Sequence, residues 1–433
     1  MDRGIGPIIC FGDFRLDCEH RTLVCMSSGQ PASLGSHAFQ ILVHMASHPG
    51  VLVSKAELMA AAWPDVIVEE NSLSQCISSI RRALGERPGD NRYIVTEAGR
   101  GFRFAGVLRH DALASRGRTT RNAEAFQLYV AGWSALTRPG AGNLESALQR
   151  LEQAVLLDPD FALAHVCVSR SYALLAAFGA ARPKAVAAKA RSAAERALQT
   201  GPNLAEAHAQ YGHALWAFGL DSEAALASLQ HAIRIDPRSR LAHHSLALVS
   251  INLGRFDDAL AHLRAAQEED PLAANVSSNI GMTHYFAGRY HDAIAQLEFA
   301  LELDANFAHA RSLLGRCHVR LGRFDQALAQ FERRTTGSFT SKADIPMTLA
   351  LAGRRSAAEA GLAALLAEAR QSFVSPYDIA TVHAALGNTD AALRALEDAV
   401  EELSLGFVGV DPSFACLGVE PRFQALLHRL KLA

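Results

Sequence analysis

Four polar side chains recur at helical spacing between residues 71 and 82, and their types suit contact with nucleic-acid bases. They are Asn71, Gln75, Ser78 and Arg82. The other side of the same segment is an apolar stripe made of Leu73, Ile77, Ile80 and Leu84. A stripe at i, i+4, i+7 and i+11 predicts a helix that packs on a small core. Amide and hydroxyl groups can bond to base edges, whereas Arg81 and Arg82 would meet phosphate oxygens. The segment therefore predicts a DNA-recognition helix over residues 71–86.

The next segment, residues 92–104, predicts a basic hairpin beside that helix. It alternates as a strand, breaks at Gly99, Arg100 and Gly101, and resumes as a second strand. Such a pattern is typical of two antiparallel strands joined by a tight turn, here with an arginine at its tip. A basic hairpin next to a recognition helix suits binding in a groove of DNA.

The residues upstream predict the elements that hold this helix in place. Residues 37–47 have a helical pattern, and residues 51–53 form a short extended piece. Ser54 is predicted to cap a second helix through residue 62, because Glu57 stands at the capping-box spacing. Short alternating segments in residues 8–34 predict a small antiparallel sheet. The order of these elements is that of a helix-turn-helix variant.

Residues 8–106 resemble the winged-helix DNA-binding domain of the OmpR/PhoB type. The landmarks fall in order: FGDFRLD, HPGVLVSKAELMAAAW, NSLSQCISSIRRALGE, and VTEAGRGFRF in place of the family's usual T-V-R-G-x-G-Y-R-F. The resemblance implies that the third helix enters the major groove and that the hairpin, or wing, contacts the minor groove or the backbone.

The resemblance also assigns roles to individual residues. It adds three helix residues to the DNA-facing set, namely Ser72, Cys76 and Ser79. It makes three wing residues backbone contacts, namely Thr96, Arg100 and Arg103. Two departures stand out: Ser78-Ser79 lie where many members carry basic residues, and Ala98 lies where the wing often has arginine. The resemblance further implies that the loop from Trp63 to Glu70 contacts RNA polymerase.

The charge of the chain is distributed unevenly, although the net charge is only −2. Residues 1–80 carry four basic and eight acidic residues, a net charge of −4. Residues 81–121 carry ten arginines and four acidic residues, a net charge of +6. The positive segment lies where a phosphate backbone would pass. The alternative is that these arginines only solvate a small domain and its linker.

The rest of the chain is rich in alanine and leucine, and it repeats. Gly254, Gly288 and Gly322 recur at a period of 34 residues, each in a Gly-Arg-aromatic turn between two helical segments. This period and pattern resemble the tetratricopeptide repeat. Small residues on the first helices would let paired helices approach larger residues on the second, as in the pairs Ala247 and Leu263, Gly281 and Leu297, and Gly315 and Phe331.

Weaker copies on both sides bring the array to about eight helix pairs, predicted to form a right-handed superhelix in which each unit packs only on its neighbours. The pattern lapses at residues 334–345, which predicts a kink or loop there. The predicted fold class is mainly α: an N-terminal α+β winged helix-turn-helix, followed by an all-α tetratricopeptide-repeat superhelix. The predicted boundaries are residues 1–108 for the DNA-binding domain, 109–123 for a linker, 124–405 for the array and 406–433 for a C-terminal cap.

Signatures of an enzyme or a cofactor are weak. The seven cysteines include no C-x-x-C pair, which argues against a zinc cluster and fits a reducing cytoplasm. His165, His208 and His243 recur near the start of successive first helices, where they predict a polar lining of the groove rather than a metal site. Cys76 is either a redox switch or, more simply, a packed thiol. No enzymatic activity, cofactor or metal is therefore expected.

Other absences bear on localisation and signalling. The longest apolar run falls short of the roughly 18 to 20 residues that a membrane helix needs, and charges interrupt the N-terminus. A cytoplasmic protein without a membrane segment is expected. Both halves together resemble one-component regulators of the HilA and CadC kind, and the absence of a preceding receiver domain argues against activation by a histidine kinase.

Two functions from different classes fit this sequence. The first is a transcription factor that binds double-stranded DNA, with the array receiving a signal from a protein, peptide or small ligand. The second is a tetratricopeptide-repeat scaffold whose winged helix does not bind DNA specifically; the low basic content of residues 72–80 supports it.

Overall fold

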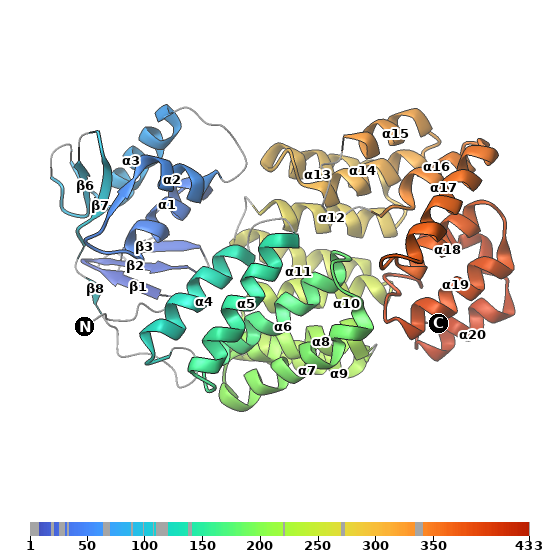
Figure 1. Ribbon diagram of the computed structural model, residues 1–433, viewed down its shortest axis with the longest axis horizontal. Coiled ribbons are helices and arrows are strands. Elements are labelled where there is room, and N and C mark those ends of the chain that lie inside the picture. Colours follow the sequence, from blue (N-terminus) through green and yellow to red (C-terminus); the bar gives the residue numbers. More distant parts are fainter. Residues whose placement is uncertain are drawn as a thin grey trace. The chain divides into compact units, whose positions relative to one another are not determined.

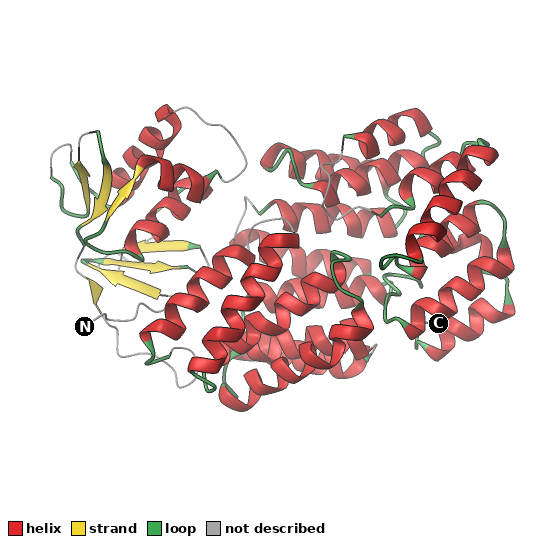
Figure 2. Cartoon of the chain, viewed as in Figure 1, coloured by secondary structure: helices red, strands yellow, loops and turns green. Residues whose placement is uncertain are grey.

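A computed structural model of the chain describes most of its residues (Figure 1). The described ranges are 8–18, 21–25, 31–32, 34–63, 70–87, 90–97, 99–106, 108–109, 120–136, 141–219, 221–269, 273–333 and 341–432. The chain divides into two compact units, Met1–Gln127 and Leu128–Ala433, and each is treated by itself below. Within the described ranges, strands occur only in the first unit and the second is helical (Figure 2).

The first unit begins with an antiparallel sheet, as residues 8–34 predict. Its strands are β1 (Ile8–Phe11), β2 (Phe14–Asp17), β3 (Thr22–Cys25), β4 (Pro31–Ala32) and β8 (Leu108–Arg109), in the order β4-β3-β2-β1-β8. Strand β8 pairs with β1 in the register Cys10 to Arg109 and Phe11 to Leu108. The sequence pattern does not predict β8, because two residues are too few to show an alternation.

Three helices and a second sheet complete this unit in the predicted order. They are α1 (Ser36–Ala46), β5 (Leu52–Ser54), α2 (Lys55–Ala62), α3 (Glu70–Ala83), β6 (Ile94–Glu97) and β7 (Gly101–Phe104), with the second sheet in the order β5-β7-β6. The predicted capping box is present: the Ser54 side chain accepts from the Glu57 backbone N–H, and the Glu57 carboxylate accepts from the Ser54 N–H. Reciprocal capping fixes where α2 begins.

One apolar core joins both sheets to the helices of this unit. The ring of Phe11 lies 4.9 Å from that of Phe104 and 5.5 Å from that of Tyr93, both edge-on. These contacts connect β1 to the base of the β6–β7 wing, and the apolar stripe of α3 is buried in the same core. The wing and α3 therefore pack on the same core.

The second unit is a stack of helix pairs, which confirms the predicted repeat array. The pairs are α4 (Ala123–Leu136, whose first residues belong to the first unit) with α5 (Ala141–Leu157), α6 (Ala162–Ala177) with α7 (Pro183–Thr200), α8 (Ala205–Gly219) with α9 (Ser222–Ile235), α10 (Arg240–Asn252) with α11 (Phe256–Glu269), α12 (Ala274–Phe286) with α13 (Tyr290–Leu303), α14 (Ala308–Arg320) with α15 (Phe324–Glu332), α16 (Asp344–Leu351) with α17 (Arg355–Ala369), and α18 (Pro376–Ala385) with α19 (Thr389–Glu401). The first helices of successive pairs touch one another, as do α8 and α10 or α12 and α14. Of the predicted kink at residues 334–345, residues 334–340 lie outside the described ranges.

Close contact between small and large residues joins α12 to α13 and α14 to α15, as the sequence predicts. A Cβ atom added to Gly281 would lie 2.6 Å from Leu297 Cγ, and one added to Gly315 would lie 2.3 Å from Phe331 Cε1. Both distances are shorter than a carbon–carbon contact allows, so a side chain at either position would force the helices apart.

The chain after α19 contradicts the prediction that each unit packs only on its neighbours. A 3-10 helix, η1 (Pro412–Leu417), and α20 (Pro421–Arg429) follow, and α20 buries Phe423, Leu426 and Leu427 in a core shared with α19. From just after α19 into the first half of η1, however, residues 404–414 return to units far back in the array. We call them the return segment, and the surface formed by α8, α10, α12, α14, α16 and α18 the first-helix face. The repeat pattern contains no information on this path.

Candidate nucleic-acid interface

The outward side of α3 presents a short row of polar side chains. Leu73, Ile77, Ile80 and Leu84 are buried, which confirms the predicted stripe and fixes the rotation of the helix. Asn71, Gln75, Ser78 and Arg82 are exposed, and so is Ser74, which the sequence reasoning did not single out. The Ser78 hydroxyl donates to the Ser74 carbonyl at 2.8 Å. The exposed amides of this row are therefore those of Asn71 and Gln75.

The three helix residues added by family resemblance lie at the margins of this row. Ser72, Cys76 and Ser79 are half-buried, and Cys76 packs against the core of the first unit. Burial raises the pKa of the Cys76 thiol, so the thiol stays protonated. A packed thiol fits this setting better than a redox switch, which requires a thiolate.

Arg81 and Arg82 have different surroundings although they are adjacent. Arg82 is exposed, whereas the side chain of Arg81 is only 28% exposed. The Arg81 guanidinium donates from Nη2 to the Ile94 carbonyl at 3.0 Å and to Thr96 Oγ1 at 2.8 Å. Arg81 thus ties α3 to β6 and positions the wing, while Arg82 is the one of the two that faces solvent.

A buried glutamate strengthens the same junction. Glu86 Oε1 accepts from the backbone N–H groups of Tyr93 and Ile94, and Glu86 Oε2 lies 3.8 Å from Arg81 Nε. The Glu86 side chain is 1% exposed. Sequence reasoning missed this residue; its one signal is a carboxylate directly after the glycine that ends α3. The carboxylate fixes the start of β6 relative to the end of α3.

The wing is the predicted hairpin, with Arg100 at its tip and 72% exposed. Glu97 pairs with both wing arginines: its Oε2 lies 3.5 Å from Arg100 Nη1, and its Oε1 accepts from Arg103. Sequence reasoning missed Glu97 as a partner of these arginines. One carboxylate therefore offsets part of the positive charge of Arg100 and Arg103, and an approaching phosphate would have to compete with it.

Gly101 lets the wing lie against β5. Its φ is +150°, and an added Cβ atom would lie 2.1 Å from the Val53 carbonyl oxygen. The turn glycine Gly99 has a φ of +72°. These two residues thus serve the backbone of the hairpin, in agreement with the interpretation of Gly99, Arg100 and Gly101 as a wing turn.

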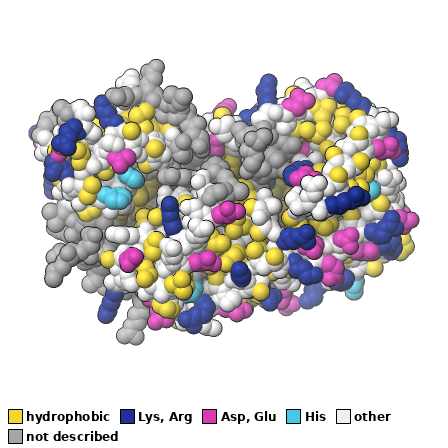
Figure 3. Space-filling model, in the orientation of Figure 1, with side chains coloured by type: hydrophobic (Ala, Val, Ile, Leu, Met, Phe, Trp, Pro, Cys, Tyr) yellow, Lys and Arg dark blue, Asp and Glu magenta, His cyan; other side chains and the backbone are white. Residues whose placement is uncertain are grey.

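Basic side chains gather at the edge of the first unit that carries this hairpin. Figure 3 shows Lys and Arg atoms there, over the position at which Figure 1 draws β6 and β7. Arg82, Arg87, Arg92 and Arg100 are all exposed. Of the loop predicted to contact RNA polymerase, residues 64–69 lie outside the described ranges.

The sequence predicts that three recurrent histidines of the array line a polar groove. In the structure, each of them also bonds to the backbone of a nearby turn. His165, His208 and His243 each place Nε2 at 2.8–3.0 Å from the carbonyl oxygen of a proline six residues earlier. A carbonyl only accepts, so in each ring Nε2 carries the proton. These histidines brace the turn before their own helix. In the described part of the chain, no three His, Cys, Asp or Glu residues gather closely enough to hold a metal ion.

The helix, its tied wing and the stacked helix pairs define the class of protein: an OmpR/PhoB-type winged-helix DNA-binding domain joined to tetratricopeptide repeats. Residues 29–104 match a family model described as "Transcriptional regulatory protein, C terminal", and residues 287–335 match one described as "Tetratricopeptide repeat". None of the helices in the described ranges has the length and apolar character needed to cross a membrane.

One regulator and two solved structures are similar to parts of this chain. The chain is 35% identical over 94 residues to the transcriptional regulator HilA of Salmonella typhimurium, a match that covers 22% of this chain and 16% of HilA. The response regulator DrrB of Thermotoga maritima, an OmpR/PhoB homolog, is 29% identical, with 23% of this chain and 44% of DrrB covered and a TM-score of 0.22. YrrB, a tetratricopeptide-repeat protein with an unusual peptide-binding site, is 24% identical, with 39% of this chain and 82% of YrrB covered and a TM-score of 0.27. The likeness to HilA is thus confined to about the length of the winged-helix domain.

Proposed function

We propose that this chain is a cytoplasmic one-component transcriptional regulator that binds promoter DNA through α3 and the wing. The observation that supports this most strongly is the outward row of α3, with Asn71, Gln75 and Arg82 exposed beside a wing that Arg81 ties to the helix. Amides in a major groove can read adenine by paired hydrogen bonds, and an arginine at the end of the helix can contact phosphate.

The predicted DNA-contacting set is ranked by this geometry. Asn71 and Gln75 are proposed to read bases, and Arg82 and Arg100 to contact phosphates. Ser72, Ser78 and Ser79 would add backbone or water-mediated contacts at the helix surface. Thr96, Arg81 and Arg103 would act mainly by positioning the wing, because their side chains already bond within the unit. Cys76 contributes packing.

The repeat array is proposed to be the regulatory module, which binds a protein or peptide and receives the signal. Stacked helix pairs offer an extended surface suited to this task. Contact of the winged-helix domain with RNA polymerase is part of the same proposal and follows from the family resemblance. The proposal assigns no catalytic reaction, cofactor or metal to the chain.

One observation favours a second candidate, a scaffold whose winged helix does not bind DNA specifically. Glu97 engages both wing arginines, and Arg81 is engaged by β6, so the basic surface is smaller than the composition of residues 81–121 suggests. A scaffold of this kind would bind proteins through the array and would bind DNA weakly or not at all.

A gel-shift titration separates the two candidates. The full-length chain is titrated against a fragment from its own upstream region and against a shuffled fragment of equal composition, with Gln75→Ala as the test variant and Arg255→Ala, in the array, as the control. A regulator binds the first fragment more tightly, and Gln75→Ala removes that preference while Arg255→Ala keeps it. Equal binding of both fragments by the wild-type chain would favour the scaffold.

A further inference from the structure

The return segment lies along the first-helix face and contacts helices that are distant in sequence. The chain leaves α19 through Leu403 and Gly406, which both have a positive φ, of 56° and 53°. It then forms a turn in which the Phe407 carbonyl accepts from the N–H groups of Val410 and Asp411, at 3.0 and 2.9 Å. This turn presents Phe407 and Asp411 to the array.

The apolar anchor of the segment is Phe407. Its ring lies 4.9 Å from the ring of Phe286 on α12 and 6.0 Å from that of Trp216 on α8. Phe407 and Val410 both pack against the core formed by α10 to α14. Aromatic pairs at such distances attract one another beyond the effect of the apolar area that they bury. The site for Phe407 is therefore built from two units of the array.

The polar anchors lie further along the same face. The Asp411 carboxylate accepts from the Tyr377 hydroxyl at 2.6 Å and from the Ser413 N–H at 2.8 Å. The Ser413 hydroxyl accepts from Arg320 Nη2 at 2.9 Å. Asp411 is buried, whereas the Arg316 guanidinium pairs with Asp344, Nε to Oδ1 at 2.8 Å. Next to the aromatic site, the array thus offers a hydroxyl donor for a carboxylate and a guanidinium donor for the residue two positions later.

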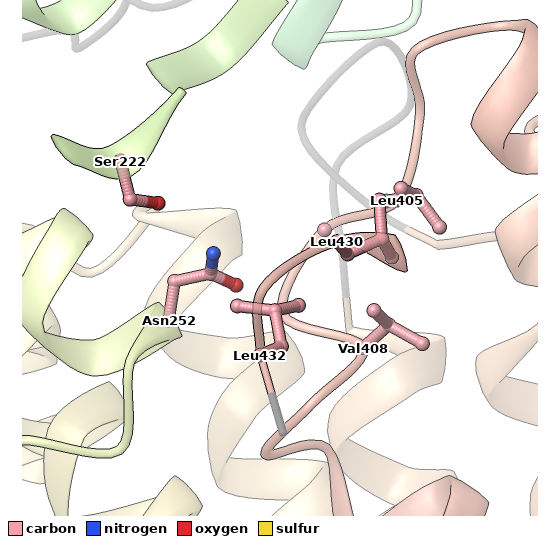
Figure 4. Close-up of a pocket in the computed structure, with 7 residues that line it drawn as sticks. Ser222, Asn252, Leu405, Val408, Leu430 and Leu432 are labelled. Carbon is pink, nitrogen blue, oxygen red and sulfur yellow. The ribbon is translucent and has the colours of Figure 1, made fainter. Parts of the chain in front are cut away.

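Packing beneath the segment is incomplete. A small cavity separates it from α9 and α10, with Ser222 and Asn252 on one side and Leu405, Val408, Leu430 and Leu432 on the other (Figure 4). In the described part of the chain, Asn252 Oδ1 and Ser404 Oγ are buried without a hydrogen-bond partner. Buried polar atoms without partners each cost free energy. The segment therefore occupies this face without satisfying all of its polar groups.

We propose that the first-helix face is a peptide-binding site for an aromatic residue followed four positions later by a carboxylate, and that the return segment is its ligand within the same chain. A segment of a partner protein with the same chemistry binds by displacing residues 404–414. The inference deepens the proposed function, on which it rests, by naming the kind of partner that the array receives. An intramolecular ligand acts at an effective concentration in the millimolar range, so it blocks weaker partners and yields to those that bind better.

The test uses the full-length chain and a fluorescent synthetic peptide of residues 403–414, LSLGFVGVDPSF. Anisotropy is measured with the wild-type chain, with Phe407→Ala, and with Val419→Ala, a control whose side chain is 87% exposed. We expect Phe407→Ala to bind the peptide at least tenfold more tightly than wild type or Val419→Ala, because its own segment is weakened. Peptides that carry Phe407→Ala or Asp411→Asn should not bind.

Two further variants test the same site if Phe407→Ala fails to fold. Ser413→Ala removes only the hydroxyl that accepts from Arg320 and should give a smaller gain in peptide binding. Trp216→Ala, combined with either variant, should abolish that gain. Folded variants that bind the peptide no better than wild type, or that bind the altered peptides equally well, overturn the proposal. DNA binding of the same proteins is measured in parallel, so its absence with intact peptide binding would refute only the proposed transcriptional function.

Discussion

Replacing Arg82 with alanine should reduce the salt dependence of DNA binding by one phosphate contact. Arg82 is exposed at the end of α3, whereas Arg81 beside it bonds to the wing. Each phosphate contact contributes about 0.9 to the slope of log affinity against log salt. Between 50 and 200 mM salt, a fourfold change, the loss of one contact should therefore shrink the fall in affinity by about 3.5-fold. Anisotropy with a labelled promoter fragment at four salt concentrations measures this slope.

Arg81→Ala is the matched control for Arg82→Ala, since it removes the same charge one residue away. It deletes two hydrogen bonds to β6, which together stabilise the wing by about 1–3 kcal/mol. We expect a lower midpoint of thermal unfolding for a fragment of residues 1–110, which contains the whole core of the first unit, and a salt slope close to that of wild type. If Arg81→Ala flattened the slope and Arg82→Ala left it unchanged, the assignment of the two arginines would be reversed. Wild-type binding that is indifferent to salt would refute the phosphate contacts altogether.

Gln75→Ala should change which sequences are preferred, at a cost of about 1–3 kcal/mol on the best site, as measured by competition between fragments; equal weakening on every fragment would assign Gln75 to the backbone. Glu97→Gln should release Arg100 and Arg103, tighten binding and steepen the salt slope by up to about 0.9 per arginine, and weaker binding by a folded variant would show that Glu97 instead orients the wing. Gly315→Ala should destabilise the array by about 1–3 kcal/mol in urea unfolding, because its Cβ would meet Phe331. The control Gly219→Ala, with open space around it, should be neutral or slightly stabilising. Burial lowers the pKa of His213 to about 4, of His244 to about 3 and of His309 to about 4. Below pH 6.5 these histidines therefore bind protons in the unfolded chain but not in the folded array. The free energy of unfolding should therefore fall between pH 6.5 and pH 4, against a smaller opposite effect from Asp378, whose pKa burial raises to about 6. Stability that does not change over this range would contradict the lowered pKa values of these half-buried histidines.

Local periodicity accounts for the parts of the fold that the sequence predicts well. The apolar stripe of α3, the Ser54 capping box and the 34-residue repeat each depend on residues a few positions apart, and each is confirmed. The contacts between Gly281 and Leu297 and between Gly315 and Phe331 follow from the same register. In these cases one helix face or one turn determines the structure, so spacing alone is sufficient.

Residue spacing does not predict contacts between segments that are distant in sequence. Arg81 and Arg82 look equivalent in sequence, yet one residue turns a helix by about 100°, which directs Arg81 to the wing and Arg82 to solvent. Glu86 and Glu97 acquire their partners only when the hairpin folds back. The return segment has no repeat pattern, and its partners Trp216 and Phe286 lie more than a hundred residues away. No spacing pattern in the sequence predicts a contact between residues so far apart.

The short pairing of β8 with β1 has a mechanical consequence. Leu108 and Arg109 form the last strand of the first unit in the described ranges, and they pair with Phe11 and Cys10 at the edge of the five-stranded sheet. A pull on the chain beyond Arg109 would act first on this two-residue ladder. We expect β8 to peel away under low force while Phe11 keeps its contact with Phe104 at the base of the wing. Loss of β8 would then leave the core beneath α3 and the wing intact.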